Sequence, residues 1–128
     1  MARDEITIQL PTITNTTGAA IKELTLQAVT VANGIKLKKA MECMRNTLML
    51  LVTNSAGADK TVTLKAGNKY PNACLGDLTL PIGTGKTATI VVQDPSRFVD
   101  ADGAICIDFG TGFTGTIAAV AKPTGIGQ

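Results

Sequence analysis

The sequence predicts an all-β fold, a β-sandwich or jelly-roll-like barrel of about eight strands. Three features of the chain favour this fold. Apolar side chains recur with a period of two, Thr fills many of the positions between them, and turn-forming residues separate the alternating segments. Alternation sends one set of side chains into a core and the other set outward. Short strands at this spacing are typical of sandwiches and barrels, and not of βαβ units.

The alternating segments extend along the whole chain. In order, they are residues 6–10, 24–27, 29–31, 61–65, 105–109 and 116–121, and residues 89–92 are strand-like without alternation. The alternation changes phase around Ala28, which predicts a bulge or a strand that switches faces. Asn33-Gly34 is a strong hairpin signal, and the glycine-containing stretches 83–85 and 100–103 predict further turns.

Residues 38–51 carry two patterns. Apolar residues at helical spacing predict a short helical turn near residues 38–45, followed by a strand from 47 to 53. These residues are Met41, Met44, Leu48 and Leu51. The pattern leaves open whether the whole of 38–51 is helix or strand.

The chain divides into three regions. We expect residues 1–18 to form an extended N-terminal arm and residues 19–123 to form a β-sandwich domain. Residues 124–128 are expected to be a flexible C-terminal tail. The length of 128 residues suits one domain with one modest core.

Apolar residues alternate in the arm until Pro11, which cannot donate to a central ladder. The candidate interface residues are Ile6, Ile8, Leu10 and Ile13. One interpretation is an edge strand of the chain's own domain, because strands close in sequence often pair. The other is a strand that adds to a neighbouring subunit or to a partner protein, whose pockets these side chains would fill.

Charged residues are scarce. They make up 17% of the chain, against about 25% in an average globular protein. A surface with little charge is suited to burial against partners, because desolvating a charge is costly; the alternative is a Thr-rich β protein that is soluble alone. The net charge of +2 creates no strong field for nucleic acid or an anionic membrane. No segment resembles a signal peptide or a membrane span, so we expect synthesis in a cytoplasm.

No pattern in the sequence predicts a catalytic, cofactor-binding or metal site, and we expect a protein that is not an enzyme. There is no histidine, and three widely spaced cysteines argue against a zinc site or a disulfide framework. Residues 83–87 end like a phosphate-binding loop, but Leu80 stands where that motif needs glycine, and a strand-like segment follows. We therefore expect a glycine-rich hairpin loop there, and a tight turn at 100–103 instead of a calcium loop.

Several segments carry a resemblance to a known family. They are residues 46–54, 62–67, 75–78, 94–99, 102–103, 107–109 and 112–117, within about residues 25–123. In this order and spacing they resemble a family of small structural proteins of tailed bacteriophages, often assigned as head decoration (cement) or minor head proteins. The resemblance implies a β-sandwich or jelly-roll-like domain on the outside of an icosahedral shell.

The function implied by this resemblance is that of a virion structural protein, a decoration protein that binds the outer surface of the phage head and stabilises it. The implied partners are the major capsid protein and further copies of the chain, as a trimer, with no nucleic acid and no membrane. The implied location is the outer capsid surface of the virion, after synthesis in the host bacterial cytoplasm. Two alternatives stay open among binding proteins: a tail or head–tail connector component, and a carbohydrate-binding module for host attachment. A small hydrolase is a third.

Overall fold

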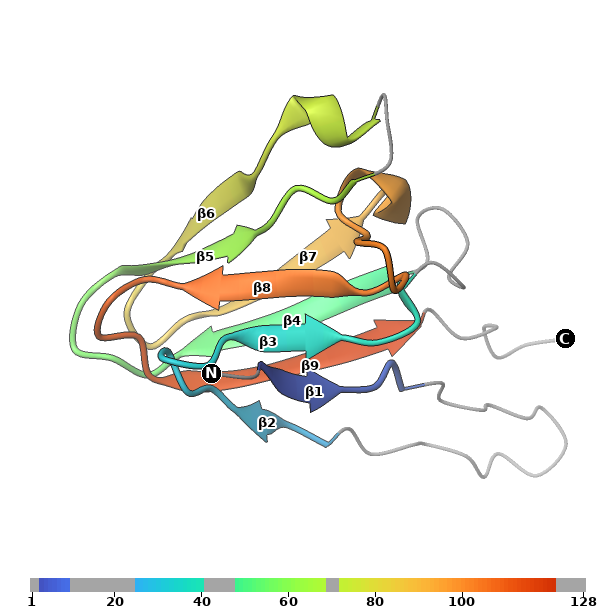
Figure 1. Cartoon of the computed structure of the whole chain (residues 1–128). Coiled ribbons are helices and arrows are strands. Elements are labelled where there is room, and N and C mark those ends of the chain that lie inside the picture. Colours follow the sequence, from blue (N-terminus) through green and yellow to red (C-terminus); the bar gives the residue numbers. More distant parts are fainter. Residues whose placement is uncertain (1–2, 10–24, 41–47, 69–71, 122–128) are drawn as a thin grey trace, which may run out of the picture.

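The computed structural model describes residues 3–9, 25–40, 48–68 and 72–121, which form two packed β-sheets (Figure 1). The five-stranded sheet has the order β1 (Asp4–Ile6), β3 (Ile35–Leu37), β8 (Ile105–Phe109), β5 (Lys60–Leu64), β6 (Leu78–Ile82). The four-stranded sheet has the order β2 (Gln27–Ala28), β9 (Gly115–Ala121), β4 (Leu48–Asn54), β7 (Thr87–Val92). Two short 3-10 helices, η2 (Asn72–Leu75) and η3 (Pro95–Arg97), lie in the connections. The predicted all-β sandwich is confirmed.

The strand pairing is nested. β5 pairs with β6, β4 with β7, β3 with β8 and β2 with β9, and every one of these pairs is antiparallel. Further antiparallel pairs, β4 with β9 and β5 with β8, join them into two sheets. This is the order of a jelly roll, in which one long antiparallel hairpin is folded over on itself. β1 lies outside the nested set and runs parallel to β3.

The core lies between the two sheets and follows from alternation. In β4 the exposure alternates strictly, with Leu48, Leu50 and Val52 fully buried. β8 alternates in the same way, so its Ile105 and Ile107 belong to the same apolar cluster. The strands predicted at 47–53, 61–65, 105–109 and 116–121 therefore match β4, β5, β8 and β9 closely.

Two turns do not form the hairpins that the sequence predicts. Asn33-Gly34 joins β2 to β3, and the 83–85 loop joins β6 to β7, but in both cases the two strands belong to different sheets. Gly34 is required because its φ is +70° and a Cβ there would lie 2.9 Å from an Asp108 carboxylate oxygen. A tight turn reverses the chain, but it does not decide whether the next strand continues in the same sheet.

Other local predictions have mixed outcomes. The turn at 100–103 is confirmed, since Asp100 N–H donates to Ala104 O at 2.8 Å. Of the alternating residues 24–31, only Gln27–Ala28 forms a strand among those described. β3 and β6 were not expected as strands. Most of the predicted helical turn near 38–45 lies outside the described residues, although Lys38 and Lys39 form a turn.

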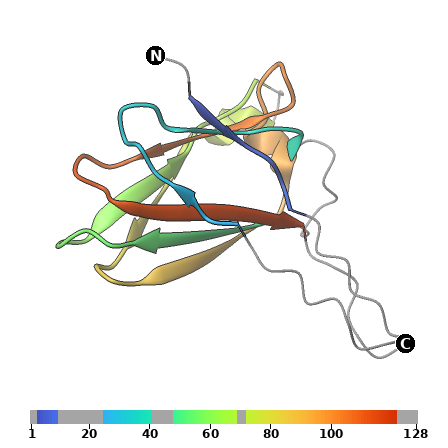
Figure 2. The same ribbon diagram turned by 90° about the horizontal axis from the view of Figure 1, so that it is seen from below.

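The N-terminal segment contacts both sheets. Asp4–Ile6 pairs with β3, and three residues later Gln9 forms a parallel bridge to Val120 of β9. Gln9 N–H donates to Ala119 O at 2.9 Å, and Gln9 O accepts from Ala121 N–H at 2.9 Å. Figure 2 shows this segment crossing from the side of β3 towards the end of β9. Residues 10–18 of the predicted arm and the 124–128 tail lie outside the described residues.

One buried polar side chain ties the loops at one end of the sandwich. Asn54, at the end of β4, is fully buried. Its amide donates to Ala58 O at 3.1 Å and to Ile82 O at 2.9 Å, and its oxygen accepts from Ala56 N–H at 2.9 Å. The side chain therefore joins the β4–β5 turn to the end of β6.

We predict that Asn54→Ala lowers the free energy of unfolding by about 2–4 kcal/mol, because buried backbone groups left without a partner cost about 1–3 kcal/mol each. Urea denaturation followed by circular dichroism measures this. Asn68→Ala, at an exposed position, is the matched control and should change stability by less than about 0.5 kcal/mol. Equal effects of the two substitutions would contradict the role assigned to Asn54.

Candidate functional site

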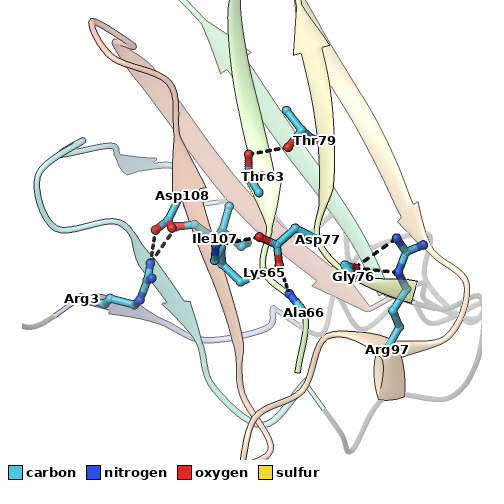
Figure 3. Close-up of polar contacts among 10 residues, drawn as sticks. All are labelled: Arg3, Thr63, Lys65, Ala66, Gly76, Asp77, Thr79, Arg97, Ile107 and Asp108. Carbon is cyan, nitrogen blue, oxygen red and sulfur yellow. Dashed lines mark hydrogen bonds and ion pairs between the residues drawn. The ribbon is translucent and has the colours of Figure 1, made fainter. Parts of the chain in front are cut away.

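The outer face of the five-stranded sheet is charged. Four ion pairs lie on or beside it, all among the described residues. They are Arg3–Asp108, Lys36–Asp102 at 2.9 Å, Lys65–Asp77 at 2.7 Å and Lys38–Glu5 at 3.9 Å. Figure 3 shows part of this network, with Arg3 reaching across to Asp108 of β8 and the carbonyl of Ile107. This face has the polar character expected of a sheet in contact with water.

Asp77 anchors the long connection between β5 and β6. It accepts a hydrogen bond from Ala66 N–H at 2.6 Å and one from Lys65 Nζ at 2.7 Å (Figure 3). The backbone hydrogen bond from Ala66, followed by that from Lys65, lowers the pKa of Asp77. The same carboxylate raises the pKa of Lys65.

The outer face of the four-stranded sheet has a different composition. The register aligns outward residues of β7, β4 and β9 in three rows across the sheet. They are Val91, Met49 and Val120; then Thr89, Leu51 and Ala118; then Thr87, Thr53 and Thr116. None of these nine residues carries a charge, and we call them the uncharged face.

The uncharged face is apolar at one end and lined with hydroxyl groups at the other. At the apolar end Val91 is 52% exposed and Met49 is half-buried. At the other end the Thr53 and Thr87 hydroxyls lie 2.8 Å apart. Leu26, which precedes β2 in the same sheet, is 54% exposed. Val91, Met49 and Leu51 are neighbours in the register and are exposed or half-buried, whereas Ala118 and Val120 of the same face are buried. Accessible apolar residues that lie together mark interaction surfaces, so the uncharged face is the candidate functional site.

One local feature of the sequence is a signal for this face. Residues 48–52 are an unbroken apolar run. A strand that buries one face should alternate apolar with polar residues, whereas a continuous apolar run indicates that both faces avoid water. Met49 and Leu51 are the members of this run that point outward.

A groove opens along the side of the sandwich between β6 and β7. It has a volume of about 410 Å³ and is lined by Leu75, Leu78, Val91 and Arg97 among others. Leu75 is 70% exposed. Arg97 donates to Gly76 O at 3.2 Å (Figure 3), and its guanidinium lies 4.9 Å from the Phe98 ring centre. The groove therefore has a mixed lining, in which apolar side chains lie beside Gln93, Asp94 and Arg97.

The aromatic residues bear on the carbohydrate-binding alternative, since sugar sites favour exposed aromatic platforms. Phe98, Phe109 and Phe113 are all buried, with exposures of 8% or less. Phe109 and Phe113 pack together with ring centres 4.8 Å apart. Phe109 belongs to the core cluster together with Ile105 and Ile107, the other inward residues of β8. Tyr70 lies outside the described residues.

The motifs examined for chemistry have structural roles. Residues 83–87 lead into strand β7, so no helix N-terminus is present there to bind phosphate. Asp100 accepts hydrogen bonds from the N–H groups of Asp102 and Ala104, which closes its turn. Burial raises the pKa of the Cys106 thiol, so it is held as the neutral group. Among the described residues, no three His, Cys, Asp or Glu side chains lie close enough to hold a metal ion.

The structure separates the four arm residues singled out from the sequence. Ile6 and Ile8 are half-buried and pack against the chain's own core cluster. Leu10 and Ile13 lie outside the described residues. Residues 4–9 pair with β3 and β9 of their own domain. Binding of a partner through the arm stays a prediction.

No helix in the described part of the chain is long and apolar enough to cross a membrane.

We predict that Asp77→Asn removes part of the acid sensitivity of the fold. Because the folded state lowers the pKa of Asp77, its carboxylate stabilises the protein above its ordinary pKa of about 3.9, and this stabilisation is lost as the pH falls through the folded pKa. The melting temperatures of wild type and variant should differ at pH 7 and converge near pH 2. Lys65→Met should keep most of the pH dependence, because the Ala66 N–H is the larger cause of the shift. A constant difference at all pH values would contradict this assignment.

Comparison of the chain with protein-family models, with curated proteins and with solved structures gave no match.

Proposed function

We propose that the protein is a virion structural protein, a decoration protein that binds the outer surface of a phage head and stabilises the shell. The observation that carries the proposal is the difference between the two outer faces of the sandwich. One face holds four ion pairs. The other has nine uncharged residues in register, of which all but the buried Ala118 and Val120 are exposed or half-buried.

Binding through the uncharged face is physically favoured. Removing apolar surface from water contributes about 25 cal/mol per Å², and no charged group on this face has to lose its hydration. The hydroxyl groups of Thr53, Thr87 and Thr116 can hydrogen-bond to a partner at the rim of the contact. The charged face would stay in water, as the outer side of a protein bound to a shell must.

A protein that binds only the assembled shell stabilises it by mass action. The gain follows RT ln(1 + [L]/Kd) for each site, or about 2.7 kcal/mol when the free concentration is a hundred times Kd. No chemical step is needed. This is consistent with a fold whose described polar residues close turns and pair with one another.

The jelly-roll order of the strands supports the proposal at the level of fold. Jelly rolls occur in viral capsid proteins and in lectins, and a fold does not by itself determine function. The buried positions of Phe98, Phe109 and Phe113 give the carbohydrate-binding alternative less support than the uncharged face gives to assembly. A tail or connector protein could use the same face, so the experiment includes tails.

We predict that Leu51→Lys, at the centre of the uncharged face, weakens binding to purified expanded capsids at least tenfold, which is about 1.4 kcal/mol. A buried, unpaired ammonium group would be costly at such a contact. Co-sedimentation of the protein with empty capsids, expanded capsids and tails measures binding and stoichiometry. Wild type should saturate the capsids at a fixed ratio.

Thr63→Lys is the matched control. Thr63 is a half-buried, outward residue of β5, a central strand of the opposite sheet. Its variant should bind capsids as wild type does. Wild type that binds tails or glycans and never capsids would refute the proposal, as would equal losses in the two Lys variants.

A further inference from the structure

The two sheets have four edge strands, and three of them carry features that block further pairing. β1 has three residues, two of them acidic, and β2 has only two residues. β6 contains Pro81, which has no N–H to offer. β7 has six residues, Thr-Ala-Thr-Ile-Val-Val, without charge or proline. Proteins normally protect an edge of this kind, because its free N–H and C=O groups are a template for another strand.

The hydrogen bonds of β4 show which backbone groups of β7 are free to pair. Asn54 N–H donates to Lys86 O at 2.9 Å, so residue 86 faces β4. Because the facing direction alternates along an antiparallel strand, Ala88, Ile90 and Val92 also face β4. The N–H and C=O groups of Thr87, Thr89 and Val91 therefore point away from the sheet. No backbone hydrogen bond from another described segment reaches them.

The charges that flank β7 are arranged symmetrically about its centre. Lys86 precedes the strand and Asp94 follows it, with seven uncharged residues between them. Both charges lie four positions from Ile90. Lys86 has no ion pair among the described residues. Asp94 accepts hydrogen bonds from both the N–H and the hydroxyl group of Ser96. It is therefore a carboxylate that already has partners, to which Lys86 of a second copy would add one, since a carboxylate can accept several hydrogen bonds.

We propose that β7 pairs with β7 of a second copy of this chain, antiparallel, about a two-fold axis at Ile90. In this register Thr89 of each copy lies opposite Val91 of the other, with the backbone groups of both facing the partner. Lys86 of each copy lies opposite Asp94 of the other, so the two-fold axis creates the ion pair twice. Registers shifted by two residues would keep the backbone pairing and lose both ion pairs.

The pairing has a consequence for the surface of the molecule. The two four-stranded sheets become one continuous sheet of eight strands, and the two uncharged faces lie side by side on it. It also covers the edge along which Leu75 and Val91, 70% and 52% exposed, flank the groove. The inference does not depend on the proposed function, because it concerns the protein in solution.

The first test uses proline at an edge position. Thr89→Pro removes an N–H that points to the second copy and leaves the β4 ladder intact. Thr79→Pro is the matched control. Pro81 of β6 has no N–H to donate to β5, so the N–H of Thr79, two residues earlier, also points away from β5. Both substitutions therefore place proline at an exposed Thr whose N–H points away from its own sheet. Sedimentation velocity over a range of concentrations should show dimers for wild type and Thr79→Pro, and monomers for Thr89→Pro. Circular dichroism should show the same fold in all three.

The second test addresses register and charge. In a chain with Ser at positions 43, 74 and 106, Ile90→Cys should oxidise to a disulfide-linked dimer, because opposed residues at a non-hydrogen-bonded pair lie about 4.5 Å apart between Cα atoms. Ala88→Cys should not, since its own copies would be offset by roughly 13 Å along the strands. Lys86→Glu should weaken the dimer at least tenfold, and added salt should weaken the wild-type dimer.

Wild type that stays monomeric at all usable concentrations, or that forms trimers, would overturn the inference. So would a Thr89→Pro variant that remains dimeric, or equal cross-linking of the two cysteine variants. Capsid binding is scored separately. A monomer that binds capsids overturns this inference and leaves the proposed function standing, whereas a dimer that never binds capsids does the reverse.

Discussion

The three hydrogen bonds of the buried Asn54 side chain are the constraint on which the rest of the sandwich depends. β4 is paired along its length on both sides, with β7 and with β9. Its inward and outward residues are both largely apolar, so the hydrophobic pattern alone specifies its register weakly. A shift by one residue would exchange Leu50 for Leu51 in the core at little cost. It would also remove Asn54 from its partners, Ala56, Ala58 and Ile82, and leave buried polar groups unsatisfied.

A second constraint acts on the same end of β4 from the other side. Gly115, at the start of β9, has a φ of +149°, and a Cβ there would lie 1.8 Å from Thr53 O. The two strands can approach this closely only because position 115 lacks a side chain. Gly115 therefore fixes β4 against β9, while the Asn54 side chain fixes the end of β4 against the β4–β5 turn and the end of β6. The rows of the uncharged face lie between these fixed ends of the strands.

The sequence predicts the fold class because alternation is a local property, readable within five to seven residues. It does so for β4, β5 and β8, where burial alternates over most of each strand. β9 also lies where alternation predicts a strand, but its residues 117–121 are all buried. Strand pairing is not local in a jelly roll. β2 pairs with β9 and β3 with β8, so a turn such as Asn33-Gly34 is followed by a strand of the other sheet. The short strand β3 has too few residues to show a period of its own.

The candidate site was less accessible from the sequence than the fold. Composition shows that charge is scarce, but a percentage does not show where the charges lie. The register places Lys36 and Asp108 on one sheet and brings nine uncharged residues of β4, β7 and β9 together on the other. The alternation of Ile6 and Ile8 is equally compatible with an arm that binds a partner and with a strand of the chain's own domain. Either arrangement buries the same alternating side chains.

The distribution of charge also bears on the proposed association of the protein with a partner. Ion pairs concentrated on one face keep that face hydrated, and each exposed pair adds only about 0–1 kcal/mol to stability. Short length, acidic residues and proline restrict pairing at β1, β2 and β6, so the proposed association would use the part of the described surface that lacks both charge and edge protection. That part is the four-stranded sheet and its β7 edge. An asymmetric distribution therefore makes association specific, where the same number of charges spread evenly would oppose it everywhere.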